Sequence, residues 1–141
     1  MTHPAVKLLD IRETPLDVDE VVAALDDETS GGLTLFVGRV RDHDGGRSVD
    51  GLDYDAHPTA LAKLTEVAEQ VADEYAVSVA AVHRVGTLAI GDIAVIVAAA
   101  AGHRGDAFAA SRALIDTLKA TVPIWKHQRF ADGTEEWVGA P

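Results

Sequence analysis

The residues best suited to take part in a reaction are two lysines, Lys119 and Lys126, on either side of Pro123. Proline has no amide hydrogen and disfavours helical geometry in the residue before it, so a helix that carries Lys119 must end here. The segment with Lys126 then leaves in a new direction, and both amines can face one pocket. A neighbouring cation and loss of water lower the pKa of such a lysine, which yields an acid, a base or a nucleophile.

The same lysines also fit a purely structural role. Arg112, Asp116 and Lys119 have the spacing of an ion-paired, solvated helix face. A lysine in the last turn of a helix also complements the helix dipole. The lysine segment by itself leaves both interpretations open.

The elements that position these lysines follow from hydrophobic periodicity. Apolar residues at helical spacing predict helices over residues 17–25 and 58–75, and a third helix that ends at Val122. Alternating or continuous apolar runs predict strands over residues 6–11, 33–41, 49–55, 77–85 and 93–101, and an edge strand over 135–138. A turn at Asp44-Gly45-Gly46 predicts a hairpin between the strands 33–41 and 49–55. The expected fold is α+β, with a mixed, mainly antiparallel sheet and about three helices in a single domain of residues 1–141.

Four further cationic residues stand at the ends of these expected elements. Arg39 and Arg41 have the same parity in a strand, and two guanidinium groups on one face suit a phosphate or a carboxylate. A polar strand face explains the same alternation. His103 and Arg104 lie beside the expected start of the third helix, where free backbone amides attract anions.

Composition excludes several classes of function. The net charge of −11 argues against nonspecific binding of nucleic acid. The chain has no cysteine, hence no disulfide, thiolate metal site or cysteine nucleophile. The six histidines include no helical HxxxH pair, and no Walker loop is present, so neither a metal site nor a nucleotide site is predicted. Residues 1–10 lack a signal-peptide pattern and no segment reaches membrane-spanning length, so a cytoplasmic protein without membrane contact is expected.

Taken together, the motifs resemble the large, catalytic subunit of molybdopterin synthase. The resemblance extends from about Leu33 to Val138. Its segments are Phe36–Arg41, Leu52–Ala56, His83–Gly86, Gly91–Asp92, His103–Arg104 with Ala107–Phe108, and Lys119 with Pro123–Lys126. Each piece alone is weak, and the joint spacing of the two HR motifs, the lysine and the PIWK motif is specific.

The resemblance implies a sulfurtransferase of molybdenum cofactor biosynthesis. Enzymes of this family convert cyclic pyranopterin monophosphate to molybdopterin by inserting two sulfurs, without a cofactor. The sulfur arrives as a thiocarboxylate on the C-terminal glycine of a small ubiquitin-like subunit, which fits a chain that has no cysteine. The implied fold is an α/β hammerhead, and the implied assembly is a central homodimer with one small subunit at each end.

Carried over by position, the resemblance makes Lys119 and Lys126 the catalytic lysines. A protonated lysine can neutralise a thiocarboxylate and a developing oxyanion, and a neutral one can relay protons. Substrate contacts fall on Arg39, Val40, Arg41, His103, Arg104, His127 and Gln128, with His103 and Arg104 able to reach across the dimer. The family usually has glutamate where this chain has Gln128, and often tyrosine where it has His57. An amide cannot act as a general base or hold a lysine by charge.

Two other functions remain compatible with the residues. One is a noncatalytic module that binds a ubiquitin-like tail or an anionic metabolite. The other is a phosphate-binding enzyme that needs no partner protein. The tolerance of Lys126 to arginine distinguishes a role in charge alone from a role in proton transfer.

Overall fold

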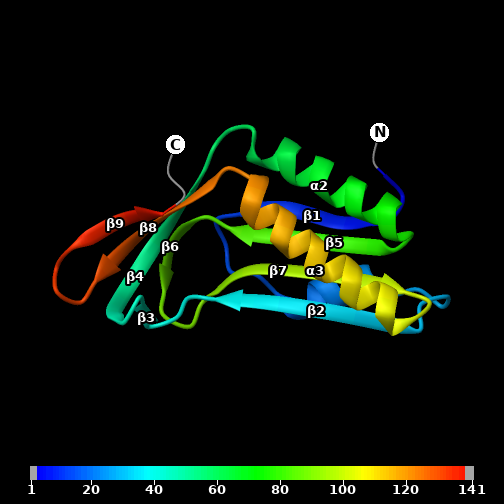
Figure 1. The fold of residues 1–141 in the computed structure, drawn as a ribbon, viewed down its shortest axis with the longest axis horizontal. Coiled ribbons are helices and arrows are strands. Elements are labelled where there is room, and N and C mark those ends of the chain that lie inside the picture. Colours follow the sequence, from blue (N-terminus) through cyan, green and yellow to red (C-terminus); the bar gives the residue numbers. More distant parts are fainter. Residues whose placement is uncertain (1–2, 139–141) are drawn as a thin grey trace.

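Two β-sheets whose strands run in different directions organise the computed structural model, which describes residues 3–138 (Figure 1). The first sheet has four strands in the order β1 (Val6–Arg12), β5 (Ser78–Arg84), β7 (Ile93–Ala101) and β2 (Gly32–Arg39). Strands β1 and β5 are parallel, and the other two pairs are antiparallel. This sheet is therefore mixed, with β1 and β2 at its edges.

The second sheet is antiparallel and is built around the long strand β4 (Arg47–Ala56). Strand β8 (Ile124–Phe130) lies along one side of β4 and continues to β9 (Glu135–Val138). The short strands β3 (His43–Asp44) and β6 (Gly86–Ala89) share the other side of β4. Strand β6 lies between β5 and β7 in the chain, so the chain leaves the first sheet, joins the second and returns.

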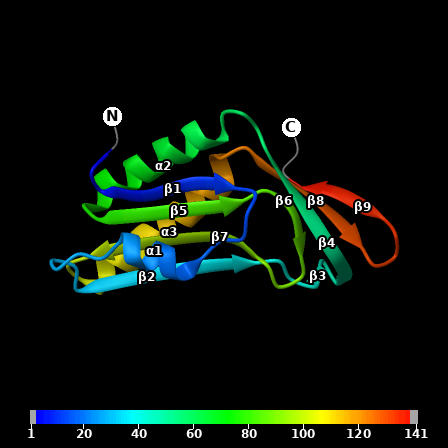
Figure 2. The same cartoon turned by 180° about the vertical axis from the view of Figure 1, so that it is seen from behind.

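The helices cover both faces of the first sheet. Helices α2 (Ala60–Tyr75) and α3 (Arg104–Thr121) lie on one face, and the short helix α1 (Val18–Ala24) lies on the other (Figures 1 and 2). Alternate residues of β7 serve the two layers: Val95 and Val97 pack with α2 and α3, whereas Ile96 and Ala98 pack on the side of α1. Because β7 is buried on both faces, its sequence is a continuous apolar run.

Apolar stripes explain why α2 and α3 pack against this sheet. Leu64, Val67 and Val71 recur on the buried face of α2. Leu114 and Leu118 do the same on α3, together with the small residues Ala107, Ala110 and Ser111. These stripes pack both helices against the sheet, and the start of α2 and the end of α3 lie near its junction with the second sheet (Figure 1).

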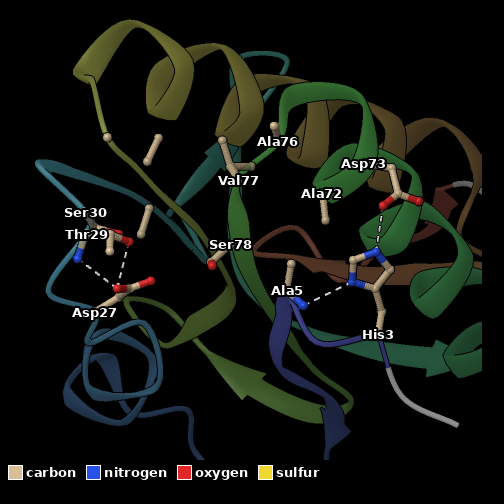
Figure 3. Close-up of a pocket in the computed structure, with 13 residues that line it drawn as sticks. His3, Ala5, Asp27, Thr29, Ser30, Ala72, Asp73, Ala76, Val77 and Ser78 are labelled. Atoms are coloured by element: carbon tan, nitrogen blue, oxygen red, sulfur yellow. Dashed lines mark hydrogen bonds and ion pairs between the residues drawn. The ribbon is translucent and has the colours of Figure 1, made fainter.

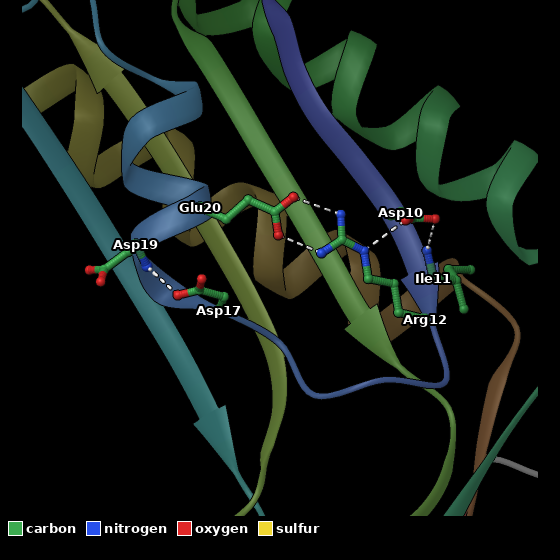
Figure 4. Close-up of polar contacts among 6 residues, drawn as sticks. All are labelled: Asp10, Ile11, Arg12, Asp17, Asp19 and Glu20. Carbon is green, nitrogen blue, oxygen red and sulfur yellow. Dashed lines mark hydrogen bonds and ion pairs between the residues drawn. The ribbon is translucent and has the colours of Figure 1, made fainter.

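Ion pairs connect α1 to the end of β1 (Figure 4). The guanidinium of Arg12 binds both carboxylate oxygens of Glu20 and also Asp10, which raises the pKa of Arg12. Asp17 caps α1, because its side chain accepts a hydrogen bond of 2.9 Å from the amide of Asp19. These contacts fix the direction in which the chain enters α1.

The α+β class and the three predicted helices are confirmed in residues 3–138. Two predictions were wrong. The strand predicted over residues 33–41 ends at Arg39, beyond a register shift at Gly38, and it pairs with β7 instead of forming a hairpin with β4. Strands β3, β6 and β8 were not predicted either; β3 and β6, with two and four residues, are too short for a periodic signal. No helix in the described part of the chain is long and apolar enough to cross a membrane.

Candidate active site

Lys119 lies in the last turn of α3, as predicted, and Lys126 lies on β8. The C-cap residue Val122 already has extended geometry (φ −80°, ψ 122°), and β8 begins directly after Pro123. The Nζ atom of Lys119 is 5.9 Å from the ring centroid of Tyr54 on β4, and Tyr54 is paired with Lys126 across the two strands. The tyrosine therefore connects the helix end to the strand that carries the second lysine.

The surroundings of Lys119 lower the pKa of its amine. Loss of water lowers its pKa, and the positive charge of Lys126 lowers it further. Lys119 as a whole is an exposed residue, so the shift comes from protein packed around part of the side chain and not from full enclosure. The ion pair expected on this helix face joins Arg112 to Asp116 at 3.6 Å, and within residues 3–138 Lys119 has no carboxylate within 4 Å.

His83, near the end of β5, is a further residue of the site beside Lys119 and Tyr54. Its side chain is buried, and its ring meets the ring of Tyr54 edge to face with centroids 4.9 Å apart. Nδ1 donates a hydrogen bond of 2.7 Å to the carbonyl oxygen of Arg84, which leaves Nε2 without the proton in the neutral ring. Burial, followed by the charge of Lys119, lowers the pKa of His83 to about 4. At neutral pH the imidazole adds no positive charge to the site.

The two faces of β8 separate two of the residues that the resemblance singled out. Lys126 and Gln128 point to one face, and His127 points to the other. His127 stacks on Trp137 of β9 with ring centroids 4.6 Å apart, and it lies 3.8 Å from Asp53. The structure therefore brings Gln128, and not His127, to the side of Lys126.

Gln128 is buried and contacts an acidic residue that the sequence did not single out. Its Nε2 donates a hydrogen bond of 2.7 Å to Oδ2 of Asp44 on β3. The other oxygen of Asp44 lies 3.3 Å from the guanidinium of Arg41. The hydrogen bond from Gln128 lowers the pKa of Asp44, and the charges of Lys126 and Arg41 lower it further. Arg41, a predicted substrate contact, is thereby connected through Asp44 to Gln128, which shares a face of β8 with Lys126.

The remaining predicted residues divide between the two ends of the first sheet. Arg39 is exposed at the end of β2 that adjoins the second sheet, and Val40 is buried against Leu52 and Leu88. His103 and Arg104 stand at the start of α3, and fifteen residues of helix place Arg104 about 22 Å from Lys119 along the axis. Gly32, at the opposite end of β2 from Arg39, packs against Arg104. One copy of the chain therefore does not bring His103 and Arg104 to its own lysines.

A cavity of about 430 Å³ lies at the same far end of the sheet (Figure 3). Its ionisable side chains are already engaged: His3 contacts Asp73 at 2.7 Å, and Asp27 accepts hydrogen bonds from Thr29. In residues 3–138, no three histidine, aspartate or glutamate side chains gather closely enough to hold a metal ion. The lysine end is where polar groups with perturbed pKa values converge, and it is the candidate active site.

Sequence reasoning singled out the lysines and Gln128 but assigned no role to Tyr54, His83 or Asp44. Tyr54 and His83 stand in segments that carry the resemblance, so their motifs were a usable signal. Asp44 gave a weaker signal, because it was read only as part of a glycine turn. Its contact with Gln128 joins residues that are far apart in the chain.

Comparison of the sequence with known protein families identifies the family of this chain. The sequence matches the family described as "MoaE protein" over residues 11–121, and the chain belongs to that family. The match ends before Lys126, whereas alignments with individual relatives extend further.

Curated relatives and a solved structure agree with this assignment. The chain is 44% identical to "Molybdopterin synthase catalytic subunit 1" of Mycobacterium tuberculosis, over 97% of this chain and 92% of that protein. It is 39% identical to "Molybdopterin synthase catalytic subunit" of a Nostoc species, over 88% of this chain and 77% of the relative. The crystal structure of molybdopterin synthase from Staphylococcus aureus superposes with a TM-score of 0.87 at 31% identity, over 92% of this chain and 96% of that one.

Proposed function

We propose that this chain is the catalytic subunit of a molybdopterin synthase. It converts cyclic pyranopterin monophosphate to molybdopterin by inserting two sulfurs, which a small ubiquitin-like subunit delivers as a C-terminal thiocarboxylate. The main support for this proposal is that Lys119 of α3 and Lys126 of β8 lie close together. The positive charge of Lys126 is near enough to lower the pKa of Lys119. Membership of the family supports the proposed reaction, and the position of the two lysines supports the proposed location of the active site. A cytoplasmic location is part of the proposal, and fractionation of cells that express the tagged chain tests it.

The different environments of the two lysines suggest different roles. Lys119, whose pKa is lowered, is the amine better suited to accept and return a proton during sulfur transfer. Lys126, on the strand face that it shares with Gln128, is placed to neutralise the thiocarboxylate and, once its sulfur is bonded to the substrate, the oxyanion that forms when water adds to the acyl carbon and that collapses as the carbon–sulfur bond breaks. Neutral His83 keeps a third positive charge out of the site.

The substrate contacts that we propose belong to two copies of the chain. Arg39, Val40 and Arg41 lie where β2 meets the second sheet, which also carries Lys126 and Gln128, whereas His103 and Arg104 stand at the far end of α3. We therefore propose that a second copy supplies His103 and Arg104. Strand β2 supports this arrangement, because it is a sheet edge that exposes Leu33, Leu35 and Phe36. His127 has no direct contact in this proposal, since its side chain faces β9.

A defined sulfur-transfer assay tests the reaction. The purified chain is mixed with a carrier protein that bears a C-terminal thiocarboxylate and with cyclic pyranopterin monophosphate, and the dithiolene product is detected by mass. The wild type and Lys63→Ala are expected to form product, because Lys63 is a surface residue of α2 that pairs with Glu66. Lys119→Ala is expected to bind the carrier and form none. Carrier binding without product by the wild type would instead favour a noncatalytic module.

Mixing two inactive variants tests the composite site. Arg104→Ala and Lys119→Ala are each expected to be inactive alone. If subunits exchange at random, half of the dimers hold one copy of each variant and have one intact site, so roughly a quarter of wild-type activity returns. No recovery in a mixture whose subunits have exchanged, as shown by mass, would refute the contribution of a second copy.

A further inference from the structure

We propose that Asp44 is a positioning residue of this active site, and that its carboxylate, held by Gln128, supplies the negative charge beside Lys126 and Arg41. This inference rests on the proposed sulfur transfer. It assigns a task to Asp44, a carboxylate that the reaction scheme leaves unused, and links it to Gln128, a proposed substrate contact.

The contact between Gln128 and Asp44 is specific. Gln128 is only 3% exposed, and a buried amide needs a hydrogen-bond partner. It donates to Oδ2 of Asp44 at 2.7 Å, and the opposite oxygen, Oδ1, is 3.3 Å from Arg41. Each oxygen of the carboxylate therefore has a different partner, which fixes the plane of the group.

The hairpin that carries Asp44 brings the carboxylate to the second sheet. Gly45 and Gly46 have φ values of +57° and +79°, and they form the two-residue turn between β3 and β4, where Asp44 pairs with Arg47. Strand β3 has only two residues, so few backbone contacts hold it. The side-chain contact with Gln128 ties Asp44 to β8, and Arg47, on the other side of the turn, lies over the ring of Phe130 on the same strand.

The position of Lys126 makes the charge of Asp44 useful. Lys126 is two residues from Gln128 on the same face of β8, and their side chains leave the strand about 7 Å apart. In the described part of the chain, Lys126 has no carboxylate within 4 Å, so its amine is free to meet an anion. The charges of Lys126 and Arg41 both lower the pKa of Asp44, as expected for a carboxylate that lies between two cations. Asp44 thus offsets part of the repulsion between Lys126 and Arg41 without forming an ion pair with the amine of Lys126.

Gln128 cannot replace Asp44 in this role, because an amide carries no charge. Two carboxylates at the distance of the present hydrogen bond would not both ionise readily. The site therefore accommodates one carboxylate and one amide. Exchanging the two groups between positions 44 and 128 leaves the net charge of the site unchanged. This exchange provides a direct test.

The experiment compares four variants with the wild type in the sulfur-transfer assay. Asp44→Asn is expected to lower kcat by roughly ten- to a hundredfold, the scale of a misplaced catalytic group. Gln128→Glu alone is also expected to lower it, and the double variant Asp44→Asn/Gln128→Glu is expected to recover most of the loss. Asp42→Asn, in the same loop, is the matched control with wild-type turnover, since Asp42 contacts only the exposed His43 among side chains. Equal turnover by Asp44→Asn and Asp42→Asn, or no recovery in the double variant, would overturn the proposal.

A second measurement does not depend on turnover. The titration of the Asp44 side-chain carboxyl is followed by carbon NMR in the wild type, Lys126→Ala and Lys63→Ala. The pKa of Asp44 is expected to rise in Lys126→Ala and to stay unchanged in Lys63→Ala. No rise in Lys126→Ala overturns the role of Asp44, even if the enzyme is active. A wild type without activity would count against the proposed function, and this titration would still decide the placement of Asp44.

Discussion

The buried histidine beside the lysine site makes the stability of this protein depend on pH in a way that can be calculated. His83 is 1% exposed, and its pKa is lowered from 6.5 to about 4 in the folded chain. Protonation therefore favours the unfolded state, whose histidine has an ordinary pKa. The stabilisation from the neutral ring is fully present above pH 6.5 and is lost as the pH falls toward 4. The difference in pKa corresponds to about 3 kcal/mol.

The assay is chemical denaturation of the wild type and His83→Gln at a series of pH values from 7 to 4. Carboxylates also titrate in this range, so the informative quantity is the difference between the two stability curves. The stability advantage of the wild type over His83→Gln is expected to shrink by about 3 kcal/mol across the range. His57→Gln is the control, because His57 is an exposed residue whose side-chain hydrogen bond is to the uncharged Thr59, and its curve is expected to run parallel to that of the wild type.

Lys119 enters the same prediction, since its charge is the second cause of the lowered pKa. Lys119→Met removes that charge, so the pKa of His83 is expected to rise and the loss of stability at low pH to become smaller. NMR titration of the His83 ring measures the pKa directly. Parallel stability curves for the wild type and His83→Gln, together with a ring that titrates near 6.5, would refute both the burial argument and the coupling to Lys119.

Three further changes test the scaffold by denaturation and circular dichroism. Leu64→Ala empties a fully buried position between α2 and the sheet, and is expected to cost about 2–5 kcal/mol of unfolding free energy with the fold retained. Gly38→Ala would place a Cβ 2.7 Å from a methyl carbon of Val95, and is expected to cost roughly 1–3 kcal/mol. Asp17→Ala removes the cap of α1 and is expected to cost about 1 kcal/mol, with Asp26→Ala, beyond the helix end, as a near-neutral control. A loss from Leu64→Ala no larger than that from Asp17→Ala would contradict the burial assigned to α2.

The sequence predicted the elements in which periodicity and side-chain burial agree. Strand β7 was recognisable because both of its faces are covered, and α3 because its apolar stripe ends at Pro123. The end of the strand that includes Arg39 was misplaced. The apolar and cationic alternation continues to Arg41, whereas the backbone leaves the ladder after a register shift at Gly38. Periodicity describes side chains and does not report where backbone pairing stops.

The active site was predictable to the extent that it is local in sequence. Lys119 and Lys126 are joined by one helix end and one proline, so their convergence follows from short-range geometry. The contact between Asp44 and Gln128 depends on how β3 and β8 are both paired with β4, which no local pattern reveals. The division of the cationic residues between the two ends of α3 was hidden for the same reason, since helix length matters only once the direction of α3 is known.

The strand order has a consequence for how the chain is made. Strand β1 pairs with β5, and β4 pairs with β8, so in both cases the partner is encoded about half the chain length later. Pairing between such distant segments closes long loops and slows folding. A nascent chain that has not yet extended past α3 exposes one whole side of β4 and lacks the strand that carries Lys126. The active site is thus among the last parts of the protein to exist during synthesis, and a chain released early would be an unpaired, aggregation-prone fragment without it.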